Sequence, residues 1–304
     1  MVSISSLDEL TTLPVMMAAA LLFASLWGFT LGHSRRMISQ KLVDTEWWPL
    51  AVSPTKSMMH NFGYPKEPTK RFPKGVTDLM ARYFYADLII ICVAHAICAS
   101  PMIPVLMYGW EKSSELMQAL FVLGTLADLG YEVYDSIQFS FRAFTKHTSS
   151  PIPIEFWVII VCLHHTTAMF LIIPLNMRYV HRFEYHQTAV SLLFAASLCF
   201  LAGAYKFTLT LDVYKKKTDF ILYKMIVLFQ LAVILYTRIY LWFPSALSLR
   251  AHMQEQNDTT FFQAATVMIT IFSMFNMMLI IDALGAAAKW LPRKFPKSDE
   301  EKTQ

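Results

Sequence analysis

Two adjacent histidines lie in the middle of a long apolar stretch, WVIIVCLHHTTAMFLIIPLN (residues 157–176). An imidazole in hydrocarbon loses its hydration and needs a hydrogen-bond partner or a polar cavity, so ionisable residues within a membrane span are candidates for function. A buried imidazole can take a proton from a nucleophile within hydrogen-bond reach. On an α-helix His164 and His165 point about 100° apart. We therefore expect one ring to face a cavity while the other supports it or reaches a neighbouring helix.

Three carboxylates precede the histidines at helical spacing. Asp128, Glu132 and Asp135 stand at i, i+4 and i+7, so they share one helical face. A charge near the middle of a bilayer costs roughly 2.5–3.5 kcal/mol on insertion scales, which predicts that all three face the bundle interior. Asp135 is then able to fix the tautomer of a catalytic imidazole. The alternative is that Glu132 and Asp135 lie at the inner membrane interface beside Arg142.

Two basic residues within apolar stretches, Lys206 and Arg238, are the natural countercharges for these carboxylates. The predicted topology places Lys206 near the inner face together with Asp135.

Thr167 lies three residues after His164 and shares its face, whereas Pro174 should bend or end that helix. The candidate catalytic residues are thus His164, His165 and Asp135, and the candidate cavity-lining residues are Asp128, Glu132, Thr167, Lys206 and Arg238.

The other histidines give no metal-binding pattern. His95 and Asp282 are lone polar residues on apolar segments and are expected to be satisfied core groups. The remaining six histidines lie in or near loops and form no HxxxH or HxxHH cluster. Di-iron desaturases and hydroxylases need many converging ligands, so the sequence predicts neither that chemistry nor a bound metal or other cofactor.

Composition defines the class of protein. Of the 304 residues 55% are hydrophobic and 16% charged, and the mean hydropathy is +0.41, which indicates a polytopic membrane protein. The apolar runs are about 20 residues long and show no alternation, so they are helices rather than barrel strands. A net charge of +4 is too small and scattered to indicate nucleic-acid binding. The four cysteines fall inside apolar runs and are expected to be reduced core residues.

We predict an all-α bundle of seven spans. They lie at residues 14–32, 83–107, 115–135, 153–175, 187–209, 220–243 and 261–286. The acidic start of the chain resembles neither a secretory signal nor a transit peptide, so we expect the first span to be retained. The division is an N-terminal helix (1–32), a basic surface loop with amphipathic character (33–81), a six-helix membrane domain (82–286) and a polar tail (287–304).

Basic residues between the spans predict the orientation. With the N-terminus outside, the inner segments carry 18 Lys and Arg and the outer segments carry 4. This asymmetry places the C-terminus inside, which is the cytosol or the mitochondrial matrix.

Two motifs together resemble the TLC-domain superfamily, which includes the ceramide synthases. GYEVYD (130–135) is similar to a GY-x-x-x-D helix end of that family, and LHHTTAM (163–169) is similar to its HH-x-x-T motif. TRIYLWF (237–243) is similar to an Arg-containing segment near the penultimate helix. The resemblance covers roughly residues 80–286. It implies a barrel of six helices, spans two to seven, around a cavity for an acyl chain, with the first span outside.

The resemblance also implies paired histidines that act as general base when an amine attacks an acyl thioester such as acyl-CoA. The chain lacks the acidic HD-x-x-D-x-x-x-E signature of ceramide synthases after the histidines, so that particular activity is not expected. An elongase needs a histidine at the position of Val161, and a retinal protein needs a lysine in the last span. Neither DRY nor NPxxY, the motifs of G-protein-coupled receptors, is present.

Two functions therefore stay open. The first is a TLC-like protein that binds or processes acyl lipids in the endoplasmic reticulum. The second is a non-catalytic lipid-binding subunit of a larger membrane complex, with the mitochondrial inner membrane as the alternative location. A transporter is a third and weaker alternative because the chain has no internal repeat.

Overall fold

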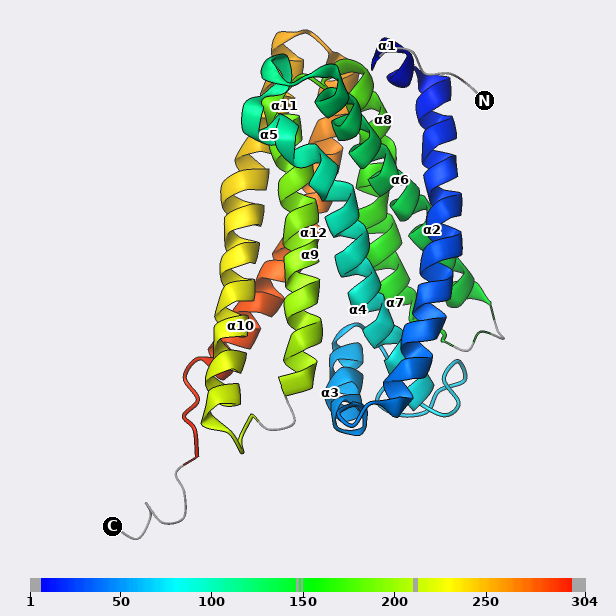
Figure 1. Cartoon of the computed structure of the whole chain (residues 1–304), viewed down its shortest axis with the longest axis vertical. Helices are drawn as coiled ribbons and strands as arrows, with labels where there is room; N and C mark the ends of the chain where they lie inside the picture. Colours follow the sequence, from blue (N-terminus) through cyan, green and yellow to red (C-terminus); the bar gives the residue numbers. More distant parts are fainter. Residues whose placement is uncertain (1–6, 146–147, 149, 210–212, 297–304) are drawn as a thin grey trace.

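The computed structural model describes residues 7–145, 148, 150–209 and 213–296. In these ranges seven helices are long and apolar enough to cross a membrane, which confirms the predicted all-α polytopic bundle (Figure 1). The spans are Leu13–Asp44, Asp78–Tyr108, Glu115–Phe144, Ile154–Arg178, Phe183–Leu209, Lys217–Glu255 and Thr259–Trp290. Most are longer than predicted because the helices continue past their apolar stretches into polar residues. Residues 297–304 of the predicted tail lie outside the described residues.

The elements follow one another as a series of helices with short connections. They are α1 (Leu7–Leu10), α2 (Leu13–Lys41), α3 (Trp48–Asn61), α4 (Asp78–Ala99), α5 (Ile103–Tyr108), α6 (Glu115–Phe144), α7 (Ile154–Trp157), α8 (Thr166–Arg178), α9 (Phe183–Leu209), α10 (Lys217–Leu235), α11 (Phe243–Glu255) and α12 (Thr259–Trp290). Three of the long helices begin at a capping side chain. Thr77, Ser114 and Asp258 accept hydrogen bonds from backbone N–H groups in the first turns of α4, α6 and α12.

Spans two to seven form a closed ring. In packing order, α4 contacts α6, α6 contacts α8, α8 contacts α12, α12 contacts α10 and α11, both of these contact α9, and α9 returns to α4. The first span, α2, lies outside this ring against α6 and α4 (Figure 1). A ring of six helices with one helix outside is a feature of the fold and does not by itself define a function.

Two glycines of α6 allow its neighbours to approach closely. A Cβ at Gly130 would lie 2.5 Å from the Cβ of Phe23 and 2.8 Å from the carbonyl oxygen of Ala20, both on α2. A Cβ at Gly124 would lie 2.8 Å from the carbonyl oxygen of Cys98 on α4. Small residues serve this purpose at many contacts between membrane helices. Gly130 therefore fixes where the outer helix docks on the ring.

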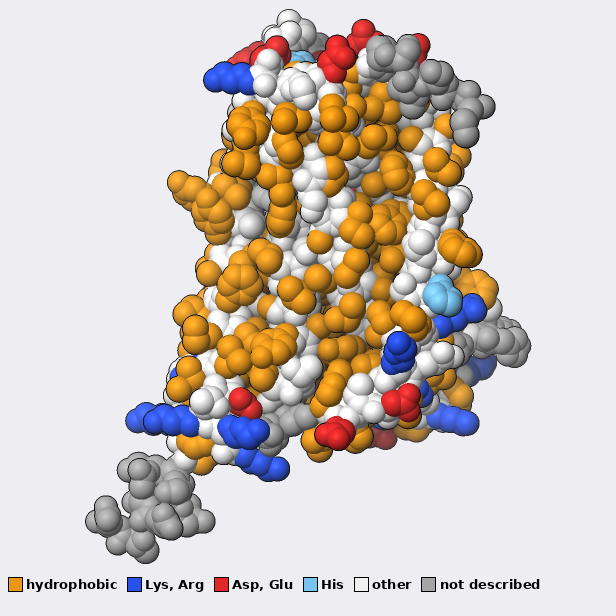
Figure 2. Space-filling model, viewed as in Figure 1, with side chains coloured by type: hydrophobic (Ala, Val, Ile, Leu, Met, Phe, Trp, Pro, Cys, Tyr) orange, Lys and Arg blue, Asp and Glu red, His pale blue; other side chains and the backbone are white. Residues whose placement is uncertain are grey.

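The surface has the polarity of a membrane protein. Hydrophobic side chains cover the middle of the molecule, and Lys and Arg side chains gather at the lower end (Figure 2). That end carries α3 and the start of α10, and the opposite end carries α1, α5 and α11 (Figure 1). The segment 33–81 is ordered: α2 continues through its beginning, and Trp48, Tyr64 and Phe72 are buried in a hydrophobic cluster with residues of α4.

Candidate functional site

The adjacent histidines lie at the end of a π-helix. Residues Val158–His165 are π-helical between α7 and α8, and the Thr166 hydroxyl donates to the carbonyl of Val161, five residues earlier. A second π-helix, Tyr236–Trp242, joins α10 to α11 and contains Arg238. π-helical segments often occur at functional sites. The prediction from sequence was an α-helix here, since composition and periodicity do not distinguish an α-helix from a π-helix. Pro174 does not end α8, which continues to Arg178.

A narrow cavity of about 150 Å³ lies inside the ring. Its polar end is formed by His95, Glu132, His164 and Arg238, and Asp128 and Thr167 also line it. The walls are mainly aliphatic and extend along α8 to Leu175. Leu175 is eleven positions after His164, so the lining residues span about 16 Å along the helix. It leads from the middle of the bundle toward the end that carries α11 and α5 (Figure 1).

His164 faces this cavity. Its Nε2 lies 3.9 Å from Oε1 of Glu132, and its ring stacks on Phe275 with the ring centres 4.6 Å apart. Phe272 contacts the same ring at 5.7 Å. The Nδ1 atom is buried and has no hydrogen-bond partner among the described residues. Aromatic packing thus holds the imidazole while its nitrogens stay free of strong protein hydrogen bonds.

His165 is enclosed by protein instead. It is 2% exposed and does not line the cavity. Its Nδ1 lies 2.9 Å from the Ser136 hydroxyl, and its Nε2 lies 2.9 Å from Oε2 of Glu132 and 3.6 Å from Asp135. Both nitrogens are therefore engaged, and His165 acts on the cavity only through Glu132.

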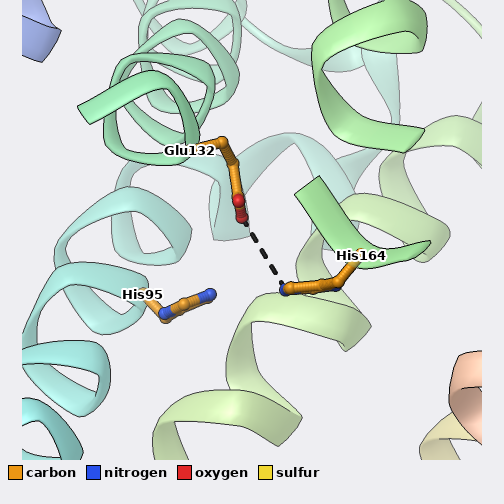
Figure 3. A group of neighbouring side chains, drawn as sticks. All are labelled: His95, Glu132 and His164. Atoms are coloured by element: carbon orange, nitrogen blue, oxygen red, sulfur yellow. Dashed lines mark ion pairs between the residues drawn. The ribbon is translucent and has the colours of Figure 1, made fainter. Parts of the chain in front are cut away.

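His95 is not a lone core residue. His95, Glu132 and His164 each offer a donor atom, and these three atoms lie within 4.8 Å of one another. Figure 3 shows the three side chains pointing into one shared space from separate helical segments. This grouping was not predicted, because the residues are far apart in the chain and Glu132 lies near the end of the predicted span 115–135. In the structure that span continues to Phe144, so all three residues lie near the middle of their spans.

The three carboxylates of α6 are all buried, but they have different surroundings. Asp128 and Glu132 line the cavity, and Oδ1 of Asp128 has no hydrogen-bond partner within the described part of the chain. Asp135 is 4% exposed and does not line the cavity. Besides His165, its basic neighbour is Arg35 of α2, whose Nη2 lies 3.9 Å away. The shared face of α6 thus serves two sites.

The second site is a paired network of Arg35, Asp87, Asp135 and Arg142. Asp87 lies 2.5 Å from Nε of Arg35 through one oxygen and 2.9 Å from Nη1 of Arg142 through the other. Arg142 also donates to the carbonyl and hydroxyl of Ser150, each at 2.9 Å. Tyr64 lies beside this network, outside the spans. Burial raises the pKa of its hydroxyl above the usual value, so the hydroxyl stays neutral.

Lys206 is placed elsewhere. Its Nζ donates to the side-chain oxygen of Gln230 at 3.4 Å and lies over the ring of Tyr223. It does not line the cavity, and its expected pairing with Asp135 is wrong because Arg35 from outside the ring occupies that position. Arg35 lies directly after the predicted first span (14–32), where it counts among the 18 basic residues of the inner segments.

Arg238 lies on the cavity wall and forms no ion pair with any carboxylate that the structure describes. It is 6% exposed, and its Nε and Nη1 have no hydrogen-bond partner in the described ranges. Its guanidinium carbon lies 5.8 Å from the centre of the Phe272 ring. Sequence analysis paired Arg238 with the carboxylates of α6, but they form their contacts with His164, His165 and Arg35 instead. Thr167, also on the wall, directs its hydroxyl to the Leu163 carbonyl at 3.5 Å.

Comparisons with protein-family models, with curated proteins and with solved structures found no match to this chain.

Proposed function

We propose that this protein binds the acyl chain of a lipid inside the membrane and acts on the polar end of that lipid, as a TLC-like acyl-transfer enzyme. One observation carries the proposal: an apolar cavity inside the ring ends at His164, Glu132 and the unpaired Arg238. Such a cavity with a few convergent polar groups is the usual form of a small-molecule site.

The lining of the cavity favours a hydrocarbon chain. Aliphatic side chains such as Leu171, Leu192 and Met253 form its walls along some 16 Å of helix. Burial of the chain in an already apolar site costs no hydrogen bonds.

Arg238 favours an oxygen-rich polar end. A buried guanidinium without a partner carries a desolvation cost of several kcal/mol. A carboxylate, a phosphate or a carbonyl oxygen in the cavity offsets that cost, and guanidinium binds such groups through two parallel hydrogen bonds. The acyl carbonyl of a thioester such as acyl-CoA, or the carboxylate of a fatty acid, meets this requirement.

His164 has the position of a general base. Its ring faces the cavity, so a nucleophile bound there can pass its proton to an imidazole nitrogen. Glu132 stabilises the imidazolium that forms, since its Oε1 lies on the same side as Nε2. His165 and Asp135 are positioning residues. His165 contacts Glu132, Asp135 contacts His165, and neither of them lines the cavity.

A lateral route into the cavity lies between α11 and α12. Arg250 and Ile269 line both the cavity and a groove on the outer surface of these helices. The outer groove carries Met274 and Met277, which face outward. Nε of Arg250 donates to the Thr266 hydroxyl at 2.6 Å, which joins the two helices at that point. A lipid that enters from the bilayer passes this contact.

Binding is tested by lipid mass spectrometry on the purified protein. The native chain should retain about one acyl lipid per molecule. Ala189→Phe places a ring in the cavity and should remove that lipid, whereas Leu201→Phe, on the outer surface of the same helix, should not. Equal lipid content in both variants contradicts binding in this cavity.

Catalysis is tested separately by cellular lipid profiles. A His164→Ala variant of normal abundance should change the level of one acyl lipid class, and its substrate should accumulate. Retained lipid binding with an unchanged profile would assign the protein to the alternative, an accessory lipid-binding subunit. Fractionation then distinguishes the endoplasmic reticulum, which the proposal favours, from the mitochondrial inner membrane.

A further inference from the structure

The geometry points to a metal site: we propose that His95, Glu132 and His164 bind one divalent transition-metal ion at the polar end of the cavity. The three donor atoms lie within 4.8 Å of one another and come from three separate spans. His95 is 4% and Glu132 2% exposed, so these groups are well separated from bulk water. Two imidazoles and one carboxylate form a donor set used by catalytic zinc and by non-haem iron(II).

His95 is prepared for metal binding by its hydrogen bond. Its Nδ1 lies 2.8 Å from the carbonyl oxygen of Ile91, which only accepts, so Nδ1 carries the proton. The other nitrogen, Nε2, is then the one with a free lone pair. The ring also packs edge-on against Tyr131 at 5.2 Å. A histidine ligand typically has this support, in which the second nitrogen donates to a backbone carbonyl.

Glu132 is supported by an ion-pair contact instead of a hydrogen bond. Oε2 lies 2.9 Å from Nε2 of His165, and the Ser136 hydroxyl lies 2.9 Å from the other nitrogen of that ring. The other oxygen of Glu132, Oε1, faces His164 and lies 3.9 Å from its Nε2. Ligating carboxylates are commonly fixed through their second oxygen. The paired histidines thus have separate tasks, one as a ligand and one as the support of a ligand.

The distances allow an ion after a small closure. A metal ion 2.1 Å from each atom in tetrahedral geometry separates its ligands by about 3.4 Å. The 3.9 Å between His164 Nε2 and Glu132 Oε1 exceeds this by about 0.5 Å, and no pair exceeds it by more than about 1.4 Å, which side-chain rotation can provide. Imidazole ligands disfavour Mg²⁺ and Ca²⁺, which prefer oxygen, and favour Zn²⁺ or Fe²⁺. An open coordination position then faces the cavity.

The two roles of His164 exclude each other: with an ion bound, His164 is a ligand and no longer a general base, and the ion would supply the polarisation of the acyl carbonyl in the proposed acyl transfer. Metal binding is still tested apart from acyl transfer, since metal content is measured without any lipid. The full-length protein is purified in detergent with a tag that contains no histidine, and its metals are measured by inductively coupled plasma mass spectrometry. We expect about one Zn²⁺ or Fe²⁺ per chain, and at least a tenfold loss in His95→Ala, Glu132→Gln and His164→Ala. The matched control is His186→Gln, another buried histidine that lies outside the cavity and donor group.

Titration of the metal-free native protein with Co²⁺ keeps the test independent of variants that fail to fold. A four- or five-coordinate His and carboxylate site gives visible absorption bands that saturate at one ion per chain. Saturable bands that disappear in His95→Ala support the site. The site is overturned if the native protein shows no such bands and contains no stoichiometric metal. It is also overturned if all three variants retain as much metal as the His186→Gln control.

Discussion

Two groups of buried charges lie side by side in this bundle, and they are built differently. In the paired network, Asp87 uses both oxygens on two arginines, and Arg142 has further bonds to Ser150. In the cavity group, His164 Nδ1, Asp128 Oδ1 and two nitrogens of Arg238 lack partners among the described residues. Buried polar groups are normally satisfied, so unsatisfied ones next to a cavity indicate a ligand.

The two groups are joined through one helix. Asp135 and Glu132 lie one turn apart on α6, and both contact His165. The network fastens α2 to α4 and α6 through its ion pairs, so it gives α6 a fixed position. Glu132 and Asp128 then project from a rigid support into the cavity. Precise placement of a site depends on such second-layer contacts.

The largest effect is expected from Asp87→Ala. This change leaves two arginines buried without their common partner, and breaking a buried pair costs roughly 3–5 kcal/mol. The variant should fail to accumulate or should melt far below the native protein in fluorescence-detected size-exclusion assays. Asp44→Ala, an exposed carboxylate, is the control. Equal stability of the two variants would show that the network does not hold α2 on the ring.

The next effect separates the two histidines. His164→Ala should lower turnover by about 10²- to 10⁴-fold, because it removes the proposed base, and should lower stability only by about 1 kcal/mol through the lost stacking on Phe275. His165→Ala should lower turnover and also stability, by about 1–3 kcal/mol, since Glu132 and Ser136 lose a buried partner. Lipid profiles and thermal unfolding of both variants measure this. Identical stability losses would contradict the difference between cavity-facing and supporting histidines.

The seven helices could be predicted from the sequence alone. An apolar, non-alternating stretch of membrane length can satisfy its backbone hydrogen bonds in lipid only as a helix. The interior face of α6 could also be predicted, since the i, i+4, i+7 spacing of Asp128, Glu132 and Asp135 is a local property. The partners of these groups depend on which helices are neighbours, and that is not local. Arg35 therefore replaced Lys206 as the partner of Asp135, and His95 joined Glu132 unforeseen.

The π-helices were beyond sequence reasoning for a related reason. One additional residue per turn changes which side chains face inward, but it leaves the hydrophobic stretch unaltered. His164 and Arg238 both lie in such segments and both reach the cavity wall. The general features of the fold are set by composition, whereas the positions of His164 and Arg238 depend on local departures from regular helix.

A smaller effect compares two buried arginines. Arg238→Met should leave stability unchanged or raised, because it removes an uncompensated charge, and should weaken binding of an anionic acyl ligand by about 10- to 100-fold. Arg35→Met, the matched change in the paired network, should instead lower stability. Binding of a fluorescent fatty acid and thermal unfolding measure the two quantities. Destabilisation of both variants to the same extent would mean that Arg238 has a structural partner.

The smallest effect concerns the route by which lipid reaches the cavity. Ile269 lines both the cavity and the outer groove, so a larger side chain there should obstruct passage between α11 and α12. Ile269→Trp should slow exchange of bound lipid with deuterated lipid in vesicles severalfold, while affinity and stability change little, because the polar end of the cavity is untouched.

Met277→Trp, on the exposed part of the same groove, is the control and should exchange normally. Time-resolved mass spectrometry of the bound lipid gives the rates. If Ile269→Trp exchanges as fast as Met277→Trp, lipid enters the cavity at another position.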